Sequence, residues 1–297
     1  MATSPGLGHP DVRFEVLPFG SAEQQAAELP AHVRLTVTCS PKHGPDHSVE
    51  AGARLRTLGH AVTVHIAARM VRDRAHLDEL LSAMAQAGID DMFLIGGDAE
   101  TATGDYASAS ELLAHVVGHP HRPAQIGIAA YPEGHPAISD TALTRSLAHK
   151  SAMADYVTTQ MCFDPKTLLR WVALQRNQGL ALPVLIGMPG RVGAARLLEM
   201  SARIGVGTSV SFVRKQRGLR SLLGLVRRSP ADRLHAALAP HIGDSQLGIA
   251  GFHYFTFNQL SATDAWHRRL YPPSASAHPA TSAVPGRGIV SPEESTT

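Results

Sequence analysis

The sequence predicts a (β/α)8 barrel with extra helical material between its seventh and eighth strands. Eight short apolar runs alternate along the chain with stretches of helical periodicity, and this alternation is typical of a parallel sheet covered by helices. Most of the runs are continuously apolar, which indicates strands buried on both faces. With eight such units in 297 residues, a closed barrel is favoured over an open doubly wound sheet.

Most of the expected strands are segments of Val, Ile, Leu and Ala. The expected strands cover residues 13–19, 34–40, 61–68, 91–98, 125–133, 156–162, 183–189 and 248–258. The expected helices follow them in turn. They cover residues 22–29, 48–58, 72–88, 106–117, 140–154, 165–179, 193–204 and 261–271. Helix starts are indicated by cap residues at Asp46, Ser139 or Asp140, and Asp164, the last followed by Pro165 at the first helical position.

The chain divides into three parts by composition. Residues 1–12 form an N-terminal extension, 13–272 the barrel, and 273–297 a tail rich in Pro, Ser, Ala and Thr that we expect to be disordered. Two further helical stretches, 209–228 and 231–240, precede the last strand, and the first carries a basic run at 214–228. This run is either a solvated helix face or a surface for a polyglutamate tail or a dinucleotide phosphate.

Composition excludes several classes of partner. The net charge of +2 and the aromatic content of 5% argue against nucleic-acid and membrane partners. Cys39 and Cys162 lie in apolar runs and are expected to be small buried hydrophobes. Neither a secretory signal nor a membrane-length apolar run is visible. We therefore expect a cytoplasmic monomer or small homo-oligomer that acts on a small molecule.

Chemistry in such a barrel is expected at the carboxyl ends of the strands. The polar and glycine residues at these positions are Glu15, Thr38, His65, Gly96, Gly97, Asp98, Tyr131, Glu133, His135, Gln160, Asp164, His253, Tyr254 and Asn258. Asp98 and Glu133 could instead cap the next helices, His65 could be a core histidine, and the glycine pair could be a tight turn. Glu15 has the weakest structural explanation, because an acid inside a buried strand is costly unless it is paired or used.

Metal and nucleotide motifs are missing from the sequence. His65, His135 and His253 stand on three different strands, as in barrel hydrolases, but no His-x-His pair lies on the first strand and no HExxH occurs. We therefore expect no metal ligands and keep a metal-dependent hydrolase only as a distant alternative. No GxGxxG, P-loop or GxSxG segment is present.

Seven segments in order resemble the methylenetetrahydrofolate reductase family over residues 13 to about 271. They are Phe14-Glu15-x-x-Pro18, His65-Ile66-Ala67-Ala68-Arg69, Gly88-Ile89-Asp90-Asp91, Gly97-Asp98, Ala129 to Pro136 (AAYPEGHP), Thr159-Gln160-x-x-Phe163-Asp164, and Phe252 to Asn258 (FHYFTFN). The resemblance implies a (β/α)8 barrel that reduces 5,10-methylenetetrahydrofolate to 5-methyltetrahydrofolate. Glu15 then falls on the general acid, Asp98 on the acid that holds the pterin and favours the cation, and Gln160 on a folate-contacting amide.

Further contacts are expected around these three residues. For the substrate, which is expected to carry glutamate or polyglutamate, they are Thr38, Tyr131, His253 and Tyr254; for the cofactor they are His65, Gly96, Gly97, Ala130, His135 and Lys150. Physical chemistry agrees with two acids in different roles, because one must stay protonated while the other faces a developing cation.

The departures from the family pattern fall on its flavin contacts. The arginine that helps to hold the flavin after the fourth strand is Gly96 here, and in the helix at 141–150 only Lys150 is clearly kept. We therefore expect NADH or NADPH to give hydride directly, with reduction through bound FAD as the alternative. A binding protein without turnover is a third possibility, against which the retained Glu15, Asp98 and Gln160 argue.

Overall fold

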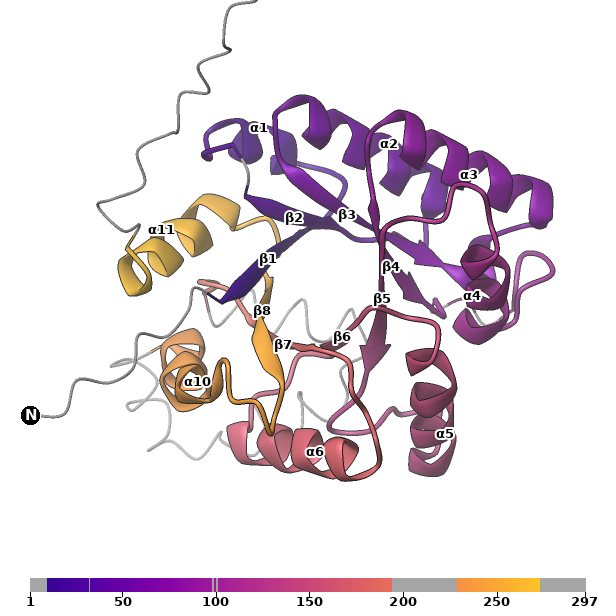
Figure 1. Ribbon diagram of the computed structural model, residues 1–297. Coiled ribbons are helices and arrows are strands. Elements are labelled where there is room, and N and C mark those ends of the chain that lie inside the picture. The colour runs from indigo at the N-terminus through magenta and orange to yellow at the C-terminus, as the bar shows by residue number, and fades with distance from the viewer. Residues whose placement is uncertain (1–9, 32, 98, 100, 194–228, 273–297) are drawn as a thin grey trace, which may run out of the picture.

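The computed structural model describes residues 10–31, 33–97, 99, 101–193 and 229–272, and eight parallel strands in it close into a barrel in chain order. Figure 1 shows this ring with helices around its outside. The strands are β1 (Asp11–Val16), β2 (Arg34–Val37), β3 (Ala61–Ala67), β4 (Asp91–Ile95), β5 (Gln125–Ala130), β6 (Tyr156–Thr159), β7 (Val184–Pro189) and β8 (Ile249–Phe255). The predicted fold class is confirmed.

A helix follows each strand in the chain. They are α1 (Ala22–Ala27), α2 (Gly44–Thr57), α3 (Arg74–Gln86), α4 (Ala109–Val117), α5 (Asp140–Ser151), α6 (Pro165–Asn177), α10 (Pro230–Leu238) and α11 (Leu260–Leu270), with 3-10 turns η1 (Ala68–Met70) and η2 (Ala239–His241). Side-chain caps fix five of the starts, at Asp73, Ser108, Ser139, Asp164 and Ser229. No helix in these residues is long and apolar enough to cross a membrane.

Several predicted boundaries differ from the structure. Helix α2 begins at Gly44 after His43, which makes no side-chain cap, so the predicted start at residue 48 behind Asp46 is wrong. Strand β1 begins at Asp11, which pairs with Gly251 of β8. The predicted helix at 193–204 lies almost wholly outside the described residues, as do the segment 209–228, its basic run and the tail at 273–297.

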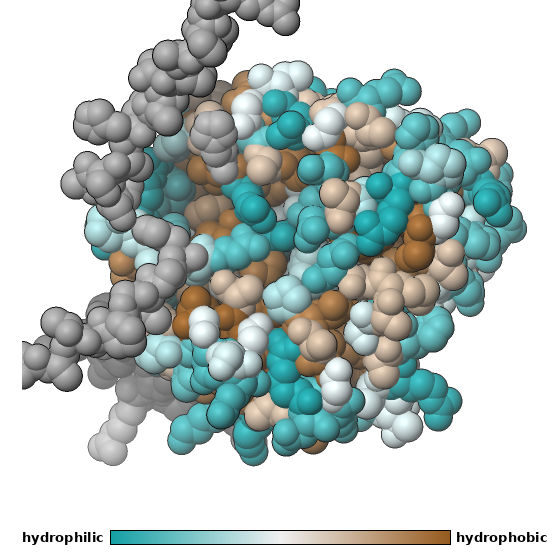
Figure 2. All heavy atoms as spheres, in the orientation of Figure 1, coloured by the Kyte–Doolittle hydropathy of each residue, from teal (hydrophilic) through white to brown (hydrophobic). Residues whose placement is uncertain are grey.

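Alternation along the strands separates an outer core from the barrel interior. Phe14 and Val16 of β1 belong to the main apolar cluster between barrel and helices, and the Phe14 ring lies 5.9 Å from His267 of α11. The residues that alternate with them along the strand, Arg13 and Glu15, therefore point inward. Hydrophilic residues cover much of the face seen in Figure 2, with hydrophobic ones grouped between them.

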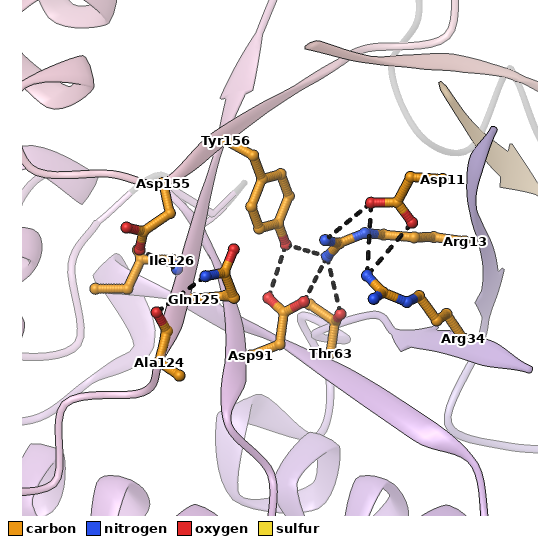
Figure 3. A network of polar contacts seen from close by, with 10 residues as sticks. All are labelled: Asp11, Arg13, Arg34, Thr63, Asp91, Ala124, Gln125, Ile126, Asp155 and Tyr156. Carbon is orange, nitrogen blue, oxygen red and sulfur yellow. Dashed lines mark hydrogen bonds and ion pairs between the residues drawn. The ribbon is translucent and has the colours of Figure 1, made fainter. Parts of the chain in front are cut away.

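A buried polar network closes the barrel interior at the amino ends of the strands (Figure 3). Arg13 Nη1 donates to Asp91 at 2.6 Å, to Tyr156 Oη at 2.6 Å and to Thr63 Oγ1 at 3.1 Å. Since β1 neighbours β2 and β8, Arg13 reaches these partners across the interior. Burial opposes the charge, but Tyr156, Asp91 and Asp11 outweigh it and raise the pKa of Arg13. We therefore look for the functional residues toward the opposite, carboxyl end of the barrel.

Candidate active site

Three ionisable side chains from β1, β3 and β8 meet inside the barrel. Glu15 Oε2 lies 3.0 Å from His253 Nε2 and 3.9 Å from His65 Nε2, and all three residues are buried. Two bare lone pairs would repel at 3.0 Å, so the contact between Glu15 and His253 holds a proton, carried by either atom. The geometry thus places one hydrogen-bonded proton between Glu15 and His253, in a buried part of the barrel.

His65 is buried beside Glu15 and Phe93. Its ring packs against Phe93 with 4.7 Å between centroids, and its Nε2 makes no hydrogen bond to the described residues. Burial, and then the neighbouring His253, lowers the pKa of His65 well below its usual range. His65 is therefore a neutral imidazole at pH 7.

The loop after β8 fixes the end of β1. The Thr256 hydroxyl donates to the Glu15 carbonyl. Asn258 Oδ1 accepts from the Leu17 amide at 2.8 Å, and its Nδ2 donates to the Phe19 carbonyl at 2.7 Å. Asn258 itself has φ of 57°, a left-handed conformation that asparagine tolerates. The sequence analysis assigned no positioning role to this loop, which depends on contacts between residues more than 230 positions apart.

A cavity of about 950 Å³ lies between the carboxyl ends of β4 and β5 and helices α5 and α6. Six of the predicted site residues line it, namely Gly96, Gly97, Ala130, Tyr131, His135 and Lys150. The backbone requires glycine at only one of the positions 96 and 97. Gly97 has φ of +89°, and a Cβ there would lie 3.0 Å from Ala67, whereas a Cβ on Gly96 would meet nothing within 4 Å. The missing side chain at Gly96 therefore leaves open space.

Lys150 is a buried cation at this cavity. It is 7% exposed, and burial alone lowers its pKa to about 8. No carboxylate among the described residues contributes to that pKa. Trp171 and Leu174 of α6 line the same cavity. Lys150 is thus a cation at this cavity that could hold an anionic group of a ligand, such as a phosphate.

The remaining predicted residues are distributed unevenly. Gln160 is half-buried just after β6, and its Oε1 accepts from the Met161 amide at 2.9 Å. Thr38 follows β2 and is half-buried. Asp98 lies outside the described residues.

Tyr254 does not belong to the site. Its ring packs against Phe14 and Trp266 in the outer core, and its hydroxyl lies 3.3 Å from His267 Nδ1. Because adjacent strand residues face opposite sides, the inward position of His253 turns Tyr254 outward. The predicted substrate contact is corrected accordingly.

Comparison with solved structures supports the fold. An uncharacterized protein from Clostridium thermocellum that binds two copies of 5-methyl-5,6,7,8-tetrahydrofolic acid matches with a TM-score of 0.60 and 13% identity, over 89% of this chain and 96% of that one. A protein described as a lyase/mutase from Burkholderia cenocepacia gives 0.48 and 15%, over 89% and 82%, a likeness too low to carry an argument.

A family model matches far more of the chain than any single motif does. The model described as methylenetetrahydrofolate reductase covers residues 22–270. That span includes His65, the cavity-lining residues and His253, and it begins shortly after Glu15. Since the match extends over most of the 297 residues, the chain belongs to the methylenetetrahydrofolate reductase family.

Proposed function

We propose that this protein reduces 5,10-methylenetetrahydrofolate to 5-methyltetrahydrofolate, with NADH or NADPH as the direct hydride donor. Glu15 gives its proton to N10 of the bridged substrate, and the bond from N10 to the bridging carbon breaks with its electron pair going to N10. The resulting 5-iminium carbon accepts hydride from the nicotinamide, which leaves as NAD+ or NADP+. Asp98 keeps the role that the family resemblance implies, opposite the cation.

The observation that carries this proposal is the contact of 3.0 Å between Glu15 and His253. A general acid needs a proton at a fixed position, and this hydrogen bond holds one between Glu15 on β1 and His253 on the adjacent strand β8. Hydrogen bonds with Thr256 and Asn258 hold the backbone of β1 at Glu15 and just after the strand at Leu17. Family membership supplies the substrate class.

The cavity at β4 and β5 supports the proposed hydride donor. Its volume of about 950 Å³ suits a nucleotide, and Lys150 supplies a cation for a phosphate. A dinucleotide held here presents its nicotinamide to the barrel mouth, where hydride transfer needs the two carbons in near-attack contact. The folate then binds at the same barrel mouth, as the second small molecule.

FAD fits these residues poorly. The family's arginine is replaced by Gly96, where open space stands instead of a cation, and the described part of α5 offers Lys150 as its buried charge. A flavin diphosphate would thus lose one of the cations that neutralise it. We route no step through a flavin.

The first test is an absorbance spectrum of the purified protein, followed by NADH oxidation with and without methylenetetrahydrofolate and with no added flavin. We expect a colourless protein that oxidises NADH only when the folate is present. Bound flavin bands at one per chain would refute direct transfer while leaving the reductase assignment intact.

A matched pair of variants tests the acid. Glu15→Gln keeps the size and hydrogen-bonding capacity of the side chain but removes the transferable proton, so turnover should fall on the order of 10²–10⁴-fold. Glu79→Gln, an exposed acid on α3, should leave turnover unchanged. Equal activity in both variants would show that Glu15 is not the acid.

A further inference from the structure

We propose that Glu15, His65 and His253 form a binding site for a divalent first-row transition-metal ion of the zinc class, and that metal bound there switches off the proton donor. The inhibitory half of this inference rests on the proposed function, and the binding half does not. It starts from a geometric fact: one carboxylate oxygen and one nitrogen from each imidazole all lie within 4.8 Å of one another.

The donor set is suited to such an ion. Two imidazoles and one carboxylate are ligands for zinc, iron, cobalt and nickel, whereas calcium and magnesium prefer oxygen alone. With metal–ligand distances of about 2.0–2.2 Å, the ligand atoms of a tetrahedral site stand about 3.3 Å apart. The distances from Glu15 Oε2 are 3.0 Å to His253 and 3.9 Å to His65, one below and one above this value. Small side-chain rotations therefore suffice to bring these ligand atoms to the spacing of a tetrahedral site.

His65 supplies the second observation. Its Nε2 is buried and has no hydrogen-bond partner among the described residues, a costly state for a polar atom. Coordination of a metal ion through Nε2 would satisfy this buried atom, which makes no hydrogen bond to the described residues. The three ligands stand on three different strands of one closed barrel, which makes the site rigid.

Metal binding and acid catalysis use the same atoms. Coordination takes the Oε2 lone pair of Glu15 and the Nε2 lone pair of His253, so the proton shared between them can no longer lie there. An ion in this position leaves Glu15 as an ionised ligand with no proton to give. Three protein ligands also leave the fourth position open, toward the barrel mouth.

Cobalt binding tests the site without reference to activity. The full-length protein, freed of metal with a chelator, is titrated with Co²⁺ and followed by its visible ligand-field absorption, and Zn²⁺ is then added to displace it. We expect one ion per chain and a spectrum of four- or five-coordinate cobalt. His65→Leu should weaken Co²⁺ binding by more than the roughly 10–100-fold that loss of an outer-shell partner costs.

The control addresses adventitious binding by surface histidines. His119 and His121 lie close together, with 5.7 Å between ring centroids, and His121→Gln should leave the Co²⁺ spectrum and affinity unchanged. Loss of binding in the His121 variant but not in the His65 variant would overturn the proposal, as would equal affinities in His65→Leu and the parent protein. If His65→Leu does not fold, X-ray absorption of the zinc-loaded parent protein decides, because fewer than two imidazole ligands would exclude this site.

Zn²⁺ inhibition of NADH oxidation, reversed by a chelator, tests the second half. A protein that binds Co²⁺ through His65 but never oxidises NADH with the folate would refute the proposed function and leave the metal site standing. A reductase indifferent to saturating Zn²⁺ would refute the inhibitory role.

Discussion

Replacing Lys150 with Met should make the protein more stable and its nucleotide binding weaker. Lys150 is 7% exposed, and no carboxylate among the described residues contributes to its pKa. Without a ligand, the folded state bears the cost of desolvating an ammonium group. Met has a similar length and no charge, so the substitution removes this cost while keeping most of the packing.

The size of the effect follows from the pKa of Lys150, which burial lowers from 10.5 to about 8. At 1.36 kcal/mol for each pKa unit, this difference corresponds to about 3 kcal/mol of lost stability. Below pH 8 the lysine is charged in both the folded and unfolded states, and the full cost is present. Between about pH 8 and 10.5 the unfolded state binds more protons, so the parent protein gains stability as the pH rises. The advantage of Lys150→Met should therefore be largest at pH 7 and nearly absent above pH 10.5.

Urea unfolding at a series of pH values measures this difference, with Lys166→Met as the control. Lys166 is exposed on α6, and its loss should change the free energy of unfolding by less than about 0.5 kcal/mol at any pH. In the same proteins, NADH affinity should fall about 10- to 100-fold for Lys150→Met alone, because a charge-assisted hydrogen bond to phosphate is worth about 1.5–3 kcal/mol. A Lys150→Met variant that is less stable than the parent by a margin independent of pH would show that the ammonium is paired, and the reasoning would fail.

Three other substitutions test the packing on which the site depends. Arg13→Leu leaves Asp91 buried without its cation, so urea unfolding should show a loss of about 3–5 kcal/mol; a loss below 1 kcal/mol would contradict the network in Figure 3. Gly127→Ala places a Cβ 2.2 Å from the Tyr156 ring, and the free energy of unfolding from thermal melting should fall by about 1–3 kcal/mol; an unchanged melting temperature would contradict this packing. A Cβ at Gly96 meets no atom within 4 Å, so Gly96→Arg should change the free energy of unfolding by less than about 0.5 kcal/mol. FAD affinity, followed by flavin fluorescence, should rise in this variant, and an unchanged FAD affinity would refute our interpretation of Gly96.

The sequence was sufficient for the fold because its signals are local. A mostly apolar, β-branched run such as 61–68 favours a buried strand, and β3 occupies Ala61–Ala67. Strand ends were predicted too long, at 91–98 against Asp91–Ile95 for example, because hydrophobicity does not mark where backbone pairing stops. The start of α2 was missed although Pro45 stands in its first turn, a signal that outweighs the acid at Asp46.

The site was predictable only in part, because its contacts join distant strands. Glu15 could be identified because an acid in a buried apolar run costs free energy. Its contact with His253 on β8 could not be predicted, because it depends on strand order and register. The predicted substrate contact at Tyr254 ignores the alternation along β8, where His253 faces the barrel interior and Tyr254 faces the outer core. The Arg13 network was not foreseen at all, since nothing in the local sequence links residues 13, 91 and 156.

The placement of the two halves of the site bears on how hydride and proton reach one substrate. In a closed barrel of eight strands taken in chain order, β5 stands opposite β1. Glu15 and His253 lie on β1 and β8, while the cavity with Lys150 opens at β4 and β5. A folate bound across the mouth would meet its proton donor on one side and the nucleotide on the other. Under the proposed direct transfer, the nicotinamide must reach from that cavity into near-attack contact with the bridging carbon, which is bonded to the nitrogen that Glu15 protonates.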